Sequence, residues 1–104
     1  MDKSLYINPP LPERGYDWKS GPQPRTRRAL DSFYRSAPIE RVKKTICEIG
    51  RRIYARGYTD GNGGNISVRV GEDLLLCTPT LCCKGFMEPR DICLVDMNAG
   101  QLCG

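Results

Sequence analysis

A glycine-rich turn separates a helical pattern from a strand pattern in the second half of this chain. Before the turn, apolar residues recur at spacings of three and four over residues 39–56, which predicts one apolar stripe along a helix. After the turn, apolar and polar residues alternate over residues 66–70, as they do in a half-buried strand. A helix that leads through the short turn GNGG, residues 61–64, into a strand indicates an α/β fold.

The neighbouring residues define the limits of these elements. We expect Ser36 to cap the start of the helix, with Pro38 in its first turn, and Gly57 to end it after Arg56. The alternating strand and a second strand over residues 74–78 are joined by a turn at residues 71–73, which predicts an antiparallel hairpin. A third short strand is expected over residues 92–95. The expected fold class is therefore α/β, with one long helix packed on a mixed or antiparallel sheet that is incomplete.

The first 38 residues have a different composition from the rest. Residues 1–24 contain five prolines and two glycines, a density that breaks regular elements. Tyr6, Tyr16 and Trp18 lie in this stretch, and we expect it to lie across a partner surface or across the remainder of its own domain. Residues 25–35 can form a short helix. We divide the chain into a Pro-rich basic arm, residues 1–38, and a domain, residues 39–104.

Composition limits the function classes that are open. With 104 residues, 39% hydrophobic and 27% charged, the chain is expected to be one soluble domain. It has no apolar run of membrane-spanning length and no apolar segment near its start. We therefore expect a cytoplasmic protein that does not bind a membrane. Arg25, Arg27 and Arg28 form a basic cluster without a nucleic-acid reading motif, so a nucleic-acid partner is not expected.

The chain contains no histidine and six cysteines. Without histidine it lacks the commonest zinc ligand and the side chain best suited to proton transfer near neutral pH. No two cysteines have the C-x-x-C spacing of a metal or redox site, and thiols stay reduced in the cytosol. We therefore expect no metal site and reduced cysteines that act mainly as small buried hydrophobic residues, with the adjacent pair Cys82 and Cys83 the most exposed to oxidation. The six are Cys47, Cys77, Cys82, Cys83, Cys93 and Cys103.

Three short motifs carry a family resemblance. Residues 61–69 follow the pattern GxxGNxSxR, residues 78–80 read TPT, and residues 91–100 follow D-I-C-x-V-D…G. In this order and spacing they resemble the class II aldolase/adducin family over roughly residues 39–104. The resemblance implies the N-terminal portion of an α/β/α domain, truncated at residue 104. The matching residues are Gly61, Gly64, Asn65, Ser67, Arg69, Thr78, Pro79, Thr80, Asp91, Ile92, Cys93, Val95, Asp96 and Gly100.

The resemblance also implies a substrate site. From the residues alone, the Gly-rich loop is either a turn or an anion site, and it is not a nucleotide motif, because those follow a strand and precede a helix. Family members use this loop and the TPT segment to bind the phosphate, or another polar end, of a small sugar. On this basis Gly64 would offer its backbone N–H, Asn65 its amide and Thr80 its hydroxyl. Leu81 stands where family aldolases commonly have a glycine, which leaves a different polar substrate open.

The family's enzymes hold zinc through three histidines and move a proton through a glutamate during retro-aldol cleavage. These residues lie downstream of the matched region, so we assign no catalytic or metal-binding residue here, and zinc is implied only for the complete family domain. The resemblance thus implies an N-terminal fragment of a sugar-phosphate aldehyde-lyase or epimerase, with homo-oligomers expected only for a complete domain. A non-catalytic adducin-like binding or scaffold module is the alternative.

Overall fold

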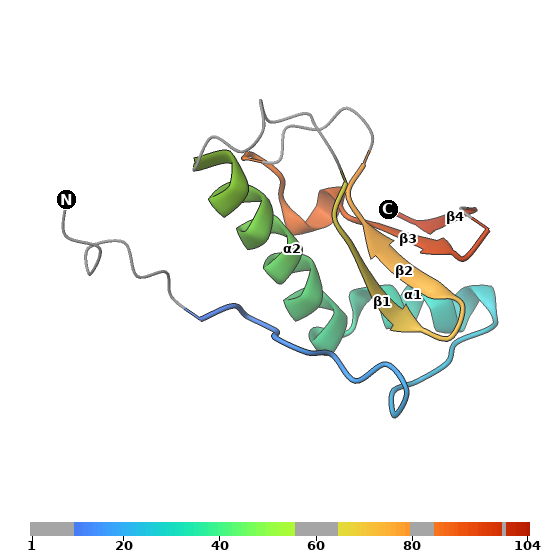
Figure 1. Cartoon of the computed structure of the whole chain (residues 1–104). Coiled ribbons are helices and arrows are strands. Elements are labelled where there is room, and N and C mark those ends of the chain that lie inside the picture. The colour runs from blue at the N-terminus through green and yellow to red at the C-terminus, as the bar shows by residue number, and fades with distance from the viewer. Residues whose placement is uncertain (1–9, 56–64, 80–84, 99) are drawn as a thin grey trace.

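The computed structural model describes residues 10–55, 65–79, 85–98 and 100–104. Figure 1 shows two helices at an angle to each other, with a small sheet against them. The helices are α1 (Arg27–Arg35) and α2 (Ala37–Ala55), and a 3-10 turn, η2 (Pro89–Asp91), precedes the third strand. The strands are β1 (Ser67–Gly71), β2 (Leu74–Cys77), β3 (Cys93–Asp96) and β4 (Gln101–Cys103). None of the described helices is both long and apolar enough to cross a bilayer.

The sheet is an antiparallel meander with the strand order β1-β2-β3-β4. The predicted α/β class is confirmed, and the sheet is antiparallel where the sequence left mixed or antiparallel open. The predicted hairpin is present, with Ser67 opposite Cys77 and a two-residue turn at Glu72 and Asp73. β4 was not predicted, because three residues between a turn and the chain end give too short a pattern to read.

The apolar stripe of α2 forms the centre of the core. Ile39 and Ile46 are completely buried and Val42 is almost so. They belong to one cluster with Val70 and Leu76 from the hairpin. Full burial of one such side chain contributes about 1.5–3 kcal/mol to folding. The predicted stripe therefore packs α2 against the sheet. The remaining core residues are Leu30, Phe33, Leu74, Met87, Ile92 and Leu94.

Ser36 joins the two helices in a way that the sequence did not predict. Its hydroxyl donates back to the carbonyl of Phe33 at 2.7 Å, so its side chain closes α1, although the residue stands at the start of α2 as expected. α2 begins from the Ser36 backbone carbonyl, which accepts from Glu40 N at 2.9 Å. The short helix expected over residues 25–35 is α1, and Thr26 caps it by accepting from Ala29 N at 3.1 Å. The predicted helix end at Arg56 and Gly57 lies outside the described residues.

The described part of the arm packs on the fold itself. Glu13 makes two hydrogen bonds with the buried hydroxyl of Thr45 in α2, its N–H donating at 2.7 Å and its carbonyl accepting at 3.0 Å. Further along, the ring of Trp18 stacks over the guanidinium of Arg69 in β1 at 4.0 Å. Gln23 then accepts from Glu72 N at 2.9 Å in the hairpin turn. Residues 13–23 therefore contact α2 and the β1–β2 hairpin, and the expected contact of the arm with a partner or a further part of the domain stays a prediction.

Candidate functional site

The two segments with the strongest family signal meet at the open end of the β1–β2 hairpin. Ile66 follows the Gly-rich loop and Thr78 begins the TPT segment, and Thr78 N donates to Ile66 O at 3.0 Å. This bond continues the register of Ser67 with Cys77 by one residue on each strand. Antiparallel pairing therefore brings together two motifs that are more than ten residues apart in the chain.

Thr78 holds this end of the hairpin with its side chain. Its hydroxyl accepts from Ile66 N at 3.2 Å and donates to Asn65 Oδ1 at 3.4 Å. The residue is only 5% exposed, so these bonds satisfy a hydroxyl that would otherwise be costly to bury. Sequence reasoning listed Thr78 as part of the motif and gave it no role. The signal for that role was the β pairing that any antiparallel hairpin over residues 66–78 requires.

Asn65 is the one predicted site residue that the structure describes. It is exposed, immediately before β1, and its Oδ1 is turned toward the Thr78 hydroxyl. An amide that accepts through Oδ1 keeps its two Nδ2–H groups as donors. Donors without a counter-charge are what a phosphate or a sugar hydroxyl requires. The other two predicted residues, Gly64 and Thr80, lie outside the described residues, so their placement stays a prediction.

The other two polar residues of the GxxGNxSxR motif, Ser67 and Arg69, lie at different places. Ser67 is exposed on β1 opposite Cys77. Arg69 donates from Nε to Gly71 O at 3.0 Å and also to Glu72 O, so it braces the hairpin turn at the far end from the loop. With Trp18 on its face, it also fixes the arm. Arg69 therefore supports the turn and the arm.

Cys77, Cys93 and Cys103 are free thiols and are half-buried. Burial is the main cause that raises the pKa of Cys77 and Cys93, and the mutual proximity of the two thiols adds to the rise for Cys77. Burial also raises the pKa of Cys103, although Arg27 Nη2 lies 2.9 Å from its sulfur. Such thiols are poor nucleophiles and poor metal ligands. Cys82 and Cys83 lie outside the described residues.

The zinc that the family resemblance implies does not fit the described residues. In the described ranges, no three His, Cys, Asp or Glu side chains lie close enough together to hold a metal ion. The full sequence also has no histidine. We therefore assign no metal-dependent step to the described residues.

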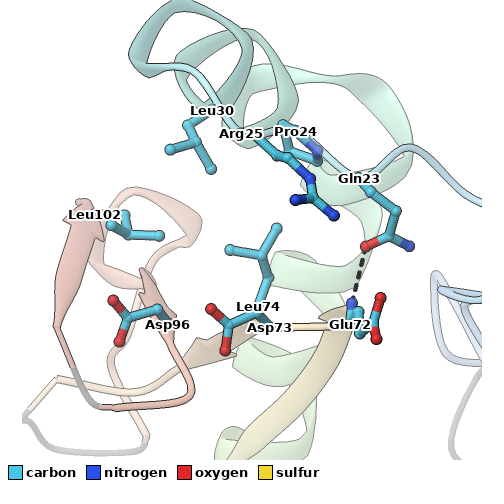
Figure 2. Close-up of a pocket in the computed structure, with 9 residues that line it drawn as sticks. All are labelled: Gln23, Pro24, Arg25, Leu30, Glu72, Asp73, Leu74, Asp96 and Leu102. Carbon is cyan, nitrogen blue, oxygen red and sulfur yellow. Dashed lines mark hydrogen bonds between the residues drawn. The ribbon is translucent and has the colours of Figure 1, made fainter.

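A separate pocket of about 640 Å³ opens at the turn end of the hairpin (Figure 2). The arm, the first turn of α1, the β1–β2 turn, β3 and β4 all contribute to its walls. Sequence reasoning missed it, because its charged residues are up to 71 positions apart in the chain, from Arg25 to Asp96. Only the fold brings Arg25, Asp73 and Asp96 to one cavity.

Comparison with known proteins settles the family. Residues 44–104, more than half of the chain, match the family described as Class II Aldolase and Adducin N-terminal domain. The chain belongs to the class II aldolase and adducin family. The matched region of this family member contains β1 to β4, most of α2 and both motif segments that meet at Asn65 and Thr78.

Three relatives of this family member carry the names of enzymes. A 3-oxo-tetronate 4-phosphate decarboxylase from Cupriavidus necator is 41% identical over 64 residues, which are 62% of this chain and 29% of the relative. An L-fuculose phosphate aldolase from Methanococcus maripaludis is 42% identical over 57 residues, 55% of this chain and 31% of the relative. A methylthioribulose-1-phosphate dehydratase from Granulibacter bethesdensis is 41% identical over 64 residues, 62% of this chain and 29% of the relative.

A solved structure agrees with these sequence matches. YgbL from Escherichia coli, for which an aldolase, epimerase or decarboxylase activity has been suggested, superposes with a TM-score of 0.58 at 29% identity. The superposition covers 62% of this chain and 31% of YgbL. The chain thus spans less than a third of the length of each of these four relatives.

Proposed function

We propose that this chain supplies the phosphate-binding part of a sugar-phosphate site of the class II aldolase type. The observation that carries the proposal is the hydrogen bond from Thr78 to Asn65 Oδ1, at 3.4 Å, where the Gly-rich loop and the TPT segment meet. It leaves the amide donors of an exposed side chain free to bind an anion. Gly64 and Thr80, on either side of this pair in sequence, would complete the set of donors.

The names of the relatives support this substrate class. The decarboxylase, the aldolase and the dehydratase each act, by name, on a phosphorylated substrate, although their reactions differ. A feature that the three share is therefore better assigned to phosphate binding than to bond cleavage. Within the proposal, reaction type, zinc and the catalytic proton donor belong to other parts of a complete family protein.

The experiment is a chimera in which the matched segment of this chain replaces that of the Methanococcus maripaludis aldolase. Asn65→Ala in the chimera should weaken the binding of L-fuculose phosphate by about tenfold to a hundredfold, since a hydrogen bond to a charged group contributes roughly 1.5–3 kcal/mol. Ser67→Ala is the matched control, because Ser67 is exposed two residues further on, in β1, and the proposal gives it no contact with the substrate. Unchanged substrate affinity in folded Asn65→Ala chimera would overturn the proposal and favour the adducin-like binding module.

A further inference from the structure

The pocket at the hairpin turn has the size and position of a second small-molecule site. Its volume of about 640 Å³ lies within the roughly 300–1,000 Å³ of typical ligand pockets. Asp73, in the β1–β2 turn, is one of its lining residues, whereas Asn65 and Thr78 occupy the opposite end of the same hairpin. A ligand here would therefore be separate from the proposed sugar phosphate.

One wall of the pocket is apolar. Leu30 from α1, Leu74 from β2 and Leu102 from β4 converge on it in Figure 2. Leu30 and Leu74 are 9% and 6% exposed, so the core fixes them and presents only an edge of each side chain to the cavity. Three leucine edges favour an aliphatic group over a polar one.

A second wall carries two carboxylates that are held in place through one oxygen each. Asp73 Oδ1 accepts from Met97 N at 3.2 Å. Asp96 Oδ1 accepts from Asn98 N and Gly100 N, both at 2.9 Å. Oδ2 of either side chain accepts no hydrogen bond from a described residue. Because backbone N–H groups fix the carboxylates, their second oxygens are ready to receive a donor without further ordering.

The remaining side carries the cation Arg25, together with a third lining carboxylate, Glu72. Figure 2 shows the guanidinium of Arg25 beside Pro24 and Gln23, away from Asp96. Arg25 forms no ion pair with any residue in the described ranges, and in particular none with Asp73 or Asp96. Cation and carboxylates thus line one cavity without neutralising each other. A ligand with a positive and a negative group could span the space between them.

We propose that this pocket binds a free α-amino acid with a branched aliphatic side chain. The ammonium group would donate to Oδ2 of Asp73 and Asp96, and the carboxylate would accept from the Arg25 guanidinium, which suits that planar group. The side chain would lie on Leu30, Leu74 and Leu102. Recognition requires all three features together, which distinguishes such a ligand from a simple amine, a simple acid or a sugar phosphate.

The test uses the 104-residue chain and three probes that differ by one group. These are L-leucine, 3-methylbutylamine, which lacks the carboxylate, and 4-methylpentanoate, which lacks the ammonium. Binding is followed by NMR shifts of the Leu74 and Leu102 methyl groups. We expect saturable binding of L-leucine on the order of 1 mM, at least tenfold tighter than either fragment.

Two charge variants separate the contacts. Asp73→Asn should weaken the binding of L-leucine and of the amine at least tenfold and leave the affinity for the acid unchanged. Arg25→Gln should weaken the binding of L-leucine and of the acid and leave the affinity for the amine unchanged. Arg28→Gln is the matched control and should change nothing, because Arg28 is exposed in the first turn of α1 and does not line the pocket. Absence of saturable methyl shifts with L-leucine would overturn the proposal. Equal affinity for the three probes, or an Arg25→Gln variant that binds L-leucine normally, would do the same.

Discussion

The ammonium group of Lys43 lies 3.3 Å from the centroid of the Tyr34 ring, and this contact joins α2 to α1. Lys43 is only 2% exposed, although it stands beside an apolar stripe that the sequence assigned to the core. Its Nζ also donates to Tyr34 O and pairs with Glu40 Oε1, both at 2.6 Å. The buried cation thus satisfies a carbonyl near the end of α1 and fixes the angle between the helices.

Lys43→Met is expected to destabilise the fold. Methionine keeps most of the apolar stem, but Tyr34 O loses its donor and the ring loses a cation, which together should cost about 1–3 kcal/mol. Urea unfolding monitored by circular dichroism measures the change. Lys44→Met, at the exposed neighbour, should stay within about 0.5 kcal/mol. A Lys43→Met midpoint equal to that of the native chain would mean that the cation is replaceable by apolar volume.

Thr45→Val is expected to release the arm. The valine has the same shape, but Glu13 loses both hydrogen bonds with the α2 hydroxyl, which should cost about 1–2 kcal/mol and raise local opening of the arm. Trypsin should then cleave after the exposed Arg14 several times faster while the domain stays folded. Thr45→Ser keeps the hydroxyl and should be cleaved at the native rate. Equal cleavage of the valine variant would show that other contacts hold the arm.

Stability is expected to fall in alkaline solution. The pKa values of Cys77 and Cys93 are raised, mainly by burial, so the folded state retains thiol protons that the unfolded chain releases above the usual thiol value of 9.0. The unfolded state then binds fewer protons, and the free energy of unfolding decreases as the pH rises. Tyr16 and Tyr34, whose pKa values burial also raises from 10.0, extend the decrease to higher pH.

Melting temperatures between about pH 8 and pH 10 test this linkage. The native chain should lose stability over this range, and Cys77→Ala should lose less, because one buried thiol no longer titrates. A melting temperature that is constant or rises over the same range would contradict the assignment of Cys77 and Cys93 to the half-buried part of the sheet.

The local sequence pattern was sufficient to predict the main helix and the hairpin. It was insufficient to predict the side-chain contacts that join these elements. The spacing of Ile39, Val42 and Ile46 fixes a helix face, and the alternation after residue 65 fixes the hairpin, because each depends only on nearby residues. Lys43 and Thr45 were missed because their burial depends on partners in α1 and the arm, Tyr34 and Glu13. No periodicity reports such contacts.

The candidate site shows the same division. The motif predicted Asn65, but the contact that orients its amide comes from Thr78, which becomes its neighbour only through strand pairing. Arg69 belongs to the same motif and yet acts at the other end of the strand. Sequence order alone cannot separate these two roles, because residues four apart on a strand point to the same face. Their contacts differ only because Thr78 pairs with one end of the strand and the hairpin turn follows the other.

The coupling between Asn65 and Thr78 gives the last prediction. If the Thr78 hydroxyl orients the Asn65 amide, the two residues act on substrate as a unit, and their effects should not add in the aldolase chimera. Thr78→Val should weaken L-fuculose phosphate, though less than Asn65→Ala does, and the double variant should be no weaker than Asn65→Ala alone. The interaction energy of the cycle is then about 0.5–2 kcal/mol, within the range for residues in contact.

Thr78→Val should also lower the melting temperature, because Ile66 N loses its acceptor. Thr78→Ser, which keeps the hydroxyl, should restore affinity. Strictly additive effects on substrate affinity would show that Thr78 only stabilises the hairpin and does not position Asn65.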